Sequence, residues 1–182
     1  IIQLNSELLL KLINDVIDIS CLDVANMKFS IKNCDVVVLC RNVVKTLSAI
    51  KQTDAEMTFE TELTSLELET DVERLQQLLI NLLVNATKFT KEGSITLKLE
   101  QAEDGKAQFS VTDTGCGIPL EKQSHIFGRF EKLNEKAQGT GLGLSICRLI
   151  IKRLNGDIWV DSSYTEGSRF IFVHPIKQEA RS

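Results

Sequence analysis

The chain has 182 residues and a mass of 20.4 kDa, which is the size of one domain. Hydrophobic residues make up 43% and charged residues 25% of it, so there is enough apolar surface to form a core, and predominant disorder is excluded. The formal net charge is −4. A general nucleic-acid-binding domain carries a basic surface, so this charge argues against nucleic acid as a partner.

The composition predicts a cytoplasmic domain with no membrane-spanning segment. The richest apolar run, Leu78–Val84, is far shorter than the ~20 residues that cross a bilayer, and the start has no signal peptide. The five cysteines form no Cys-x-x-Cys pair, so we expect reduced thiols. The chain begins without methionine inside an apolar pattern, so we expect it to be part of a longer protein.

The first 20 residues predict one amphipathic helix. Its apolar positions, from Leu9 to Ile17, follow the i, i+3, i+4, i+7, i+8 spacing of a helix stripe. A single helix of this kind needs a partner, so we expect either another helix upstream or a second copy of the chain.

The next segment predicts two helices among short strands. A helix begins after an Asp35 N-cap and extends to Ile50. The sequence Thr70-Asp71-Val72-Glu73 has the form of a capping box and opens a long helix to Phe89. The apolar stripe of this long helix consists of Leu75, Leu79, Leu82, Ala86 and Phe89. Short strands are expected over 29–33, 58–63 and 66–70.

The remaining elements are strands, glycine turns and one more helix. Alternating strands over 95–99 and 109–111 are joined by an Asp104-Gly105 turn. A helix over 141–154 ends at Asn155-Gly156, a left-handed cap, and strands over 158–162 and 169–174 follow. Helices on one face of a mixed or antiparallel sheet make an α+β fold, a two-layer sandwich.

A polar stripe lies on the long helix, where Asn81, Asn85 and Lys88 stand at i, i+4 and i+7. Amides in the middle of a leucine-rich helix are costly unless they meet a polar partner. An amide oxygen suits Mg²⁺, and a lysine one helical step on suits a phosphate. Taken alone, the stripe fits equally well amides that cap loops or bond to a neighbouring helix.

Two glycine-rich segments follow. In Asp113-Thr114-Gly115-Cys116-Gly117-Ile118, an aspartate at a strand end can accept a hydrogen bond from an exocyclic amine, although an ordinary turn is the better interpretation of this segment alone. Gly139-Thr140-Gly141-Leu142-Gly143-Leu144 opens a helix, where backbone N–H groups and the helix dipole bind anions. Its even glycine spacing matches neither a dinucleotide fingerprint nor a Walker loop.

Together, the order and spacing of these segments resemble the GHKL-type ATP-binding domain of sensor histidine kinases of two-component systems. This domain is shared with type II topoisomerases, mismatch-repair proteins and heat-shock chaperones. Leu78–Gly93 resembles the N box, Asp113–Pro119 the G1 box, Ile126–Phe130 the F box, Gly139–Ile146 the G2 box and Glu166–Phe170 the last glycine motif. The resemblance implies a Bergerat-type fold that binds ATP with Mg²⁺.

The resemblance extends upstream, since Leu9–Phe29 is similar to the end of the second helix of the dimerisation and phosphoacceptor hairpin. It implies three parts of the chain: residues 1–27 as the end of that helix and a linker, 28–178 as the catalytic domain, and 179–182 as a tail. It also implies the soluble cytoplasmic portion of a membrane-anchored sensor, with any membrane contact in missing upstream segments.

The resemblance gives individual residues a role. Asn85 would coordinate Mg²⁺, with Asn81 and Lys88 near the phosphates. Asp113 would hold the adenine amine. The remaining ATP-binding positions divide among the base pocket (Gly115, Gly117, Ile118 and Ser168), the base of the ATP lid and the lid itself (Arg129, Phe130 and Lys132), and the loop against the phosphates (Gly139, Thr140, Gly141, Leu142, Gly143 and Leu144).

Two departures from the family pattern stand out. Arg169 occupies a position where a threonine with an adenine-side contact is common. The phosphoacceptor histidine and its motif are absent, so the chain has no catalytic residue of its own. His125 and His174 are expected to be structural or surface residues.

The implied function is that of a protein-histidine kinase. The domain would bind Mg-ATP and donate the γ-phosphoryl group to a histidine upstream of this chain, for relay to an aspartate of a response-regulator receiver domain. The parent protein would be a homodimer that brings the domain to its own phosphoacceptor hairpin. Two alternatives remain: an ATP-hydrolysing conformational clamp, and a nucleotide-sensing scaffold that binds ATP without transferring phosphate.

Overall fold

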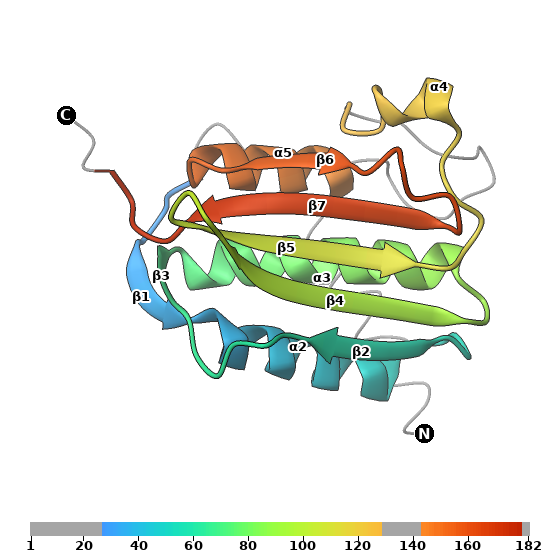
Figure 1. The fold of residues 1–182 in the computed structure, drawn as a ribbon, viewed down its shortest axis with the longest axis horizontal. Coiled ribbons are helices and arrows are strands. Elements are labelled where there is room, and N and C mark those ends of the chain that lie inside the picture. The colour runs from blue at the N-terminus through green and yellow to red at the C-terminus, as the bar shows by residue number, and fades with distance from the viewer. Residues whose placement is uncertain (1–26, 129–142, 180–182) are drawn as a thin grey trace.

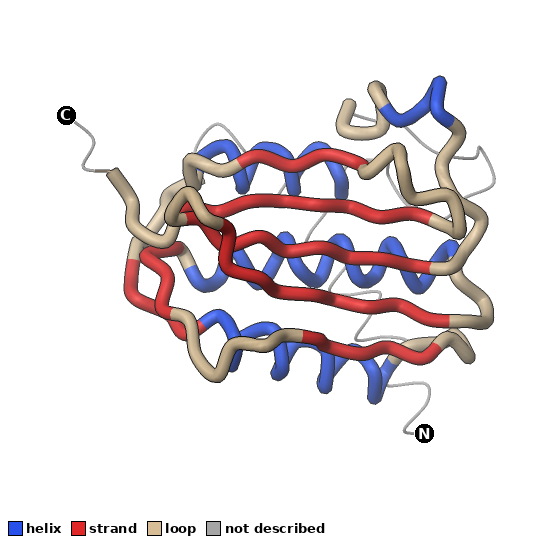
Figure 2. The backbone as a smooth tube through the Cα atoms, viewed as in Figure 1, coloured by secondary structure: helices blue, strands red, loops and turns tan. Residues whose placement is uncertain are grey.

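The computed structural model describes residues 27–128 and 143–179. The helix expected over the first 20 residues lies outside these ranges. The described chain forms a five-stranded sheet with helices on one face, and a separate two-stranded sheet beside it (Figures 1 and 2). This arrangement confirms the predicted α+β sandwich with a mixed sheet.

The five-stranded sheet has the order β2-β4-β5-β7-β6. Strand β2 pairs with β4 in parallel, and the other pairs are antiparallel. The strands of this sheet are β2 (Glu56–Glu60), β4 (Ser94–Ala102), β5 (Lys106–Asp113), β6 (Asp157–Val160) and β7 (Ser168–Pro175). Strands β1 (Lys32–Asp35) and β3 (Glu67–Thr70) pair antiparallel in the small sheet. The strand predicted over 29–33 is observed as β1, which begins later, at Lys32, and ends at Asp35.

Three helices cover the sheet on the far side in Figure 1, with α5 behind β6 and β7, α3 behind the central strands and α2 behind β2. These three helices are α2 (Val36–Ile50), α3 (Val72–Phe89) and α5 (Gly143–Arg153), and a fourth, short helix α4 (Leu120–Gln123) follows β5 outside this layer. Alternation along the strands places one set of side chains under the helices. Phe109 and Phe172, for example, are fully buried and stack with ring centroids 4.5 Å apart. No described helix covers the opposite face of the sheet, which is called the open face below.

Carboxylates start two of the helices. Asp35 accepts a hydrogen bond from the Val37 N–H at 3.0 Å, as predicted. The long helix α3 ends at Phe89 as predicted, but its N-cap is Asp71, which accepts from the Arg74 N–H at 3.0 Å. The capping-box pattern had predicted Thr70 as the N-cap. The Thr70 hydroxyl is instead 2.9 Å from His174 Nε2, so it is not available to cap the helix.

The predicted turns are confirmed. Gly105 has φ +67° in the β4–β5 hairpin, and Asn155 has φ +60° after α5. The Gly156 N–H donates to the Ile151 carbonyl at 2.8 Å, which closes α5 with the left-handed cap that the sequence indicates.

Candidate functional site: the end of strand β5 and helix α3

Asp113 is the last residue of the central strand β5, and its side chain is only 3% exposed. Its Oδ1 accepts a hydrogen bond from the Gly115 N–H at 2.9 Å. Burial raises the pKa of this carboxyl above its ordinary value, because desolvation penalises the charged form. Backbone hydrogen bonds from Gly115 and Ser168 oppose that rise in part. Among the described residues no cation lies against Asp113, and a buried carboxylate without a cation partner is typical of a binding site.

Glycines let three segments pack closely against one another around Asp113. A Cβ on Gly115 would lie 2.2 Å from the Phe89 carbonyl oxygen at the end of α3. A Cβ on Gly167 would lie 1.9 Å from the Asp113 carbonyl oxygen, and one on Gly117 would lie 3.1 Å from the Gly167 oxygen. The end of α3, the loop after β5 and the turn before β7 therefore pack at distances that a side chain would prevent.

The polar stripe of α3 extends away from this junction. Asn81 is 8% exposed, and its Nδ2 donates to the Gly143 carbonyl at 3.4 Å, which ties α3 to the first residue of α5. Asn85 is half-buried and Lys88 is exposed in the last turn of the helix. The sequence left open whether the amides serve a ligand or a neighbouring helix, and Asn81 does bond to a neighbouring helix.

Other predicted site residues lie around the same junction. Ser168 begins β7, is buried and pairs in register with Asp113. Ile118 is 9% exposed and joins the core after the Gly117 turn. Leu144 is half-buried near the start of α5 and packs against the core. The structure thus brings the N-box, G1-box and last-glycine residues to the same end of the sheet, with the start of α5 beside α3.

The predicted lid over 131–138 lies outside the described ranges, and so do seven of the predicted ATP-binding residues. They are Arg129, Phe130, Lys132, Gly139, Thr140, Gly141 and Leu142.

Thr90 lies at the candidate site but was not among its predicted residues. It is fully buried, and within the described chain its Oγ1 is the buried side-chain atom without a hydrogen-bond partner. The position of a Cβ on Gly115 is 2.7 Å from this oxygen, so the hydroxyl lies against the loop that follows Asp113. Its only signal in the sequence is weak, because a threonine directly after a long leucine-rich helix is typical of a helix end.

Magnesium fits the donors that α3 offers. No group of three or more His, Cys, Asp and Glu side chains gathers into a metal cage among the described residues. Mg²⁺ usually keeps several waters and binds through one or two protein oxygens together with substrate phosphates. The half-buried amide of Asn85 can supply such an oxygen.

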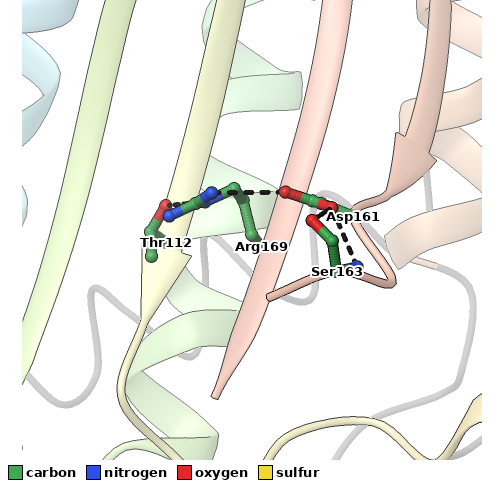
Figure 3. A network of polar contacts seen from close by, with 4 residues as sticks. All are labelled: Thr112, Asp161, Ser163 and Arg169. Atoms are coloured by element: carbon green, nitrogen blue, oxygen red, sulfur yellow. Dashed lines mark hydrogen bonds and ion pairs between the residues drawn. The ribbon is translucent and has the colours of Figure 1, made fainter. Parts of the chain in front are cut away.

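Arg169 does not take the adenine-side position of the threonine that it replaces in the family pattern. Its neighbour Ser168 is buried toward the helices, and alternation turns Arg169 to the open face of the sheet. There its Nε donates to Thr112 Oγ1 at 3.1 Å, and its Nη1 lies 3.2 Å from Asp161 Oδ2 (Figure 3).

Both histidines have the structural or surface character that the sequence predicts. His125 is exposed in the turn that follows α4. His174 is fully buried, with Nδ1 2.6 Å from the Pro175 carbonyl and Nε2 2.9 Å from Thr70 Oγ1.

Comparison with known proteins identifies this architecture. Residues 70–178 match the model of the family described as histidine kinase-, DNA gyrase B- and HSP90-like ATPases. The chain belongs to this family. The matched range contains the whole described site, from the α3 cap to β7.

Histidine kinases are prominent among its relatives. The chain is 49% identical over 109 residues to the adaptive-response sensory kinase SasA of Gloeothece citriformis, covering 58% of this chain and 28% of that protein. It is 35% identical over 182 residues to the sensor histidine kinase TmoS of Ectopseudomonas mendocina, covering 97% of this chain and 19% of that protein. The chain therefore spans less than a third of these relatives.

Solved structures agree. The catalytic domain of histidine kinase ThkA superposes with a TM-score of 0.72 at 36% identity, covering 83% of this chain and 97% of that one. ThkA in complex with the response regulator TrrA gives a TM-score of 0.75 at 31% identity, covering 89% of this chain and 47% of that one. The chain carries the ATP-binding catalytic domain of a sensor histidine kinase. None of its described helices is long and apolar enough to cross a membrane.

Proposed function

We propose that this histidine kinase domain binds Mg-ATP at the junction of α3, the loop after β5 and the start of α5, and donates the γ-phosphoryl group to a histidine upstream of residue 1. The buried Asp113 carboxylate carries this proposal. It lies at the end of a central strand with no cation against it in the described chain, and its pKa is raised by burial.

Asp113 is suited to recognise the adenine base. The Gly115 N–H binds Oδ1 and orients the carboxylate, which still has acceptor capacity for the exocyclic amine of adenine. Guanine presents a carbonyl at the corresponding position, which a carboxylate repels. Gly115, Gly117 and Ile118 would form the base pocket, with Ser168 on its adenine side.

The phosphates would lie along α3 toward α5. Lys88 is an exposed cation in the last turn of α3, and the helix that begins near Gly143 offers backbone N–H groups to an anion. Asn85 would hold Mg²⁺, which neutralises phosphate charge when bound. Arg129, Phe130, Lys132 and the segment from Gly139 to Leu142 are assigned to the lid and phosphate loop by the family resemblance.

Transfer itself needs few groups from this domain. The histidine nitrogen attacks the γ-phosphorus, the bond to the bridging oxygen breaks, and ADP leaves. Catalysis of this kind is mostly positioning and charge neutralisation. The likeness to ThkA, whose structure includes its response regulator TrrA, supports relay from the phosphohistidine to a receiver-domain aspartate, and a homodimeric parent protein would bring its hairpin to this site.

The transfer step is tested on the full-length parent protein. We expect incubation with γ-labelled Mg-ATP to label the protein with phosphate that is acid-labile and base-stable, as phosphohistidine is. Free phosphate without labelled protein would contradict transfer and indicate an ATPase clamp. ATP binding with neither product would indicate a scaffold.

The metal assignment is tested on this chain by calorimetric titration with ATP, with and without Mg²⁺. We expect Asn85→Ala to weaken the magnesium-dependent part of ATP affinity by at least about tenfold, the scale on which a damaged metal site loses affinity. Asn42→Ala is the matched control, since Asn42 is an exposed amide on α2. Equal magnesium dependence in both variants would remove Asn85 from the metal site.

A further inference from the structure

We propose that Arg169 is a positioning residue for base recognition: from the open face of the sheet it fixes the β6–β7 turn, and the end of that turn holds Asp113 in place. The inference rests on the proposed function, because it takes Asp113 as the group that recognises adenine. It concerns a residue that departs from the common family pattern and touches no part of the expected ligand.

Strand register separates two neighbouring roles. Ser168 pairs with Asp113, and Arg169 pairs with Thr112, one residue earlier on β5. Adjacent strand residues face opposite sides of a sheet. Ser168 therefore lies on the buried side of the sheet with the Asp113 carboxylate. Arg169 contacts the same two strands, β5 and β7, on the open side.

The Arg169 guanidinium joins strand β5 to the β6–β7 turn. Its Nε donates to Thr112 on β5 at 3.1 Å, its Nη1 lies 3.2 Å from Asp161 just after β6, and its Cζ lies 4.4 Å from the centre of the Tyr164 ring. Figure 3 shows the arginine extended between Thr112 and the loop that carries Asp161 and Ser163. The Arg169 and Asp161 side chains are 36% and 20% exposed, so this pair is better shielded than an ordinary surface ion pair.

Asp161 connects the arginine to the turn, because both of its carboxylate oxygens are used. Oδ1 accepts from the Ser163 N–H at 3.0 Å and from the Ser163 hydroxyl at 2.6 Å, and Oδ2 faces Arg169. The Ser163 bonds, with Arg169 adding to them, hold the pKa of Asp161 below its ordinary value. The Asp161 N–H also donates to the Arg169 carbonyl at 2.8 Å, so the turn is tied to β7 by main chain and side chain.

The far end of this turn is the part that contacts the site. Gly167 lies so close to Asp113 that a Cβ would meet the Asp113 carbonyl oxygen at 1.9 Å, and the Gly167 oxygen faces Gly117. The Ser168 N–H contributes a hydrogen bond that lowers the pKa of Asp113. A displaced turn would thus move the Asp113 carboxylate, on which the choice between adenine and guanine depends.

The test measures base preference together with stability in the full chain. Displacement of a fluorescent ATP analogue by ATP and by GTP gives the ratio of the two affinities, and thermal unfolding gives Tm. We expect Arg169→Met, which keeps the aliphatic stem, to lower the ATP-over-GTP preference by about fivefold, a typical scale for coupling through a positioning contact. Asp161→Asn should act in the same direction, and the double variant should lose less than the product of the two single effects.

Lys98→Met is the matched control. Lys98 is also an open-face cation, but it pairs with Glu100 at 2.8 Å on β4 and not with the β6–β7 turn. We expect its base preference to equal that of the wild type. If Arg169→Met does not fold, Arg169→Lys takes its place, because lysine keeps the charge and loses the fork that joins Thr112 to Asp161.

The outcomes separate two kinds of failure. A lower Tm with an unchanged ATP-over-GTP ratio in the arginine variants would overturn the inference and leave Arg169 a structural residue. Asp113→Asn is measured in parallel. If it abolishes the preference while the arginine variants keep it, the positioning role is wrong and the adenine assignment stands; if Asp113→Asn keeps the preference, the adenine assignment itself fails.

Discussion

The two ends of the paired strands β5 and β7 each bury an ionisable side chain, and they treat it differently. At one end His174 has a partner on both ring nitrogens, Pro175 and Thr70. At the other end Asp113 is held by backbone N–H groups, its pKa is raised by burial, and the neighbouring Thr90 hydroxyl has no hydrogen-bond partner in the described chain. A buried polar group with all its hydrogen bonds made is typical of a structural residue, and a buried group with an unsatisfied hydrogen bond is typical of a ligand-binding site.

The largest effects on stability should come from replacing, at each end of strands β5 and β7, a glycine that lies directly against backbone. Gly115→Ala places a Cβ 2.2 Å from the Phe89 carbonyl, and Gly156→Ala places one 2.1 Å from the Val173 carbonyl. We expect each to lower the free energy of unfolding by about 2–3 kcal/mol, because backbone on both sides must move. Denaturant unfolding measures this loss.

Nucleotide binding should separate the same two variants. Among molecules that remain folded, Gly115→Ala should bind ATP much more weakly, while Gly156→Ala should keep the wild-type affinity. Equal loss of affinity in both would contradict the assignment of the site to the Asp113 end.

A matched pair of threonines gives the next largest effect. Thr70→Val removes a hydroxyl that pairs with His174, so we expect a loss of about 1–2 kcal/mol from the buried partner left unsatisfied. Thr90→Val removes a buried hydroxyl without a partner and should change the free energy of unfolding by less than about 0.5 kcal/mol. A loss above about 1 kcal/mol at Thr90 would show that its hydroxyl already bonds within the protein, as a contact with Asp113 would require.

The smallest effect is in the slope of stability against pH. Burial lowers the pKa of His174, while the unfolded chain has the ordinary value of about 6.5. The folded state therefore resists protonation, so this contribution to stability is complete above about pH 6.5 and is lost as the pH falls toward the lowered pKa. His174→Gln should flatten the slope between pH 7 and 5 in equilibrium unfolding. An unchanged slope would mean that the ring is not held neutral.

Local patterns predicted the elements that depend on local interactions. Helix α3 ends at Phe89 as its leucine stripe indicated, and Asn155 caps α5 with the expected positive φ. The N-cap of α3 was wrong because the Thr70 hydroxyl pairs with a histidine 104 positions away. The sequence near Thr70 does not contain His174, so a local pattern could not reveal this competing partner.

The motifs single out candidate site residues, but they do not reveal the packing that supports them. Asp113 and Ser168 are recognisable from their motifs, but the burial of Thr90 and the approach of Gly167 to Asp113 depend on how separate segments pack. Arg169 illustrates the same limit. Its motif shows only that it stands where a threonine with an adenine-side contact is common, whereas strand alternation turns its side chain to the opposite face.

The most direct test of the account compares Asp113→Asn with Asp104→Asn, an exposed aspartate at the opposite hairpin turn, by ATP titration and thermal unfolding. Because the pKa of Asp113 is raised in the folded state, the folded protein binds a proton there more readily than the unfolded chain does. The stability that this difference contributes is complete below the ordinary pKa of about 3.9 and is lost as the pH rises through the raised value, so the charged carboxylate lowers stability at neutral pH. We expect Asp113→Asn to lower ATP affinity by about 30-fold or more, the worth of a charged hydrogen bond, with Tm equal or higher. Wild-type affinity with a lower Tm would contradict the account, because it would make Asp113 a structural residue like His174.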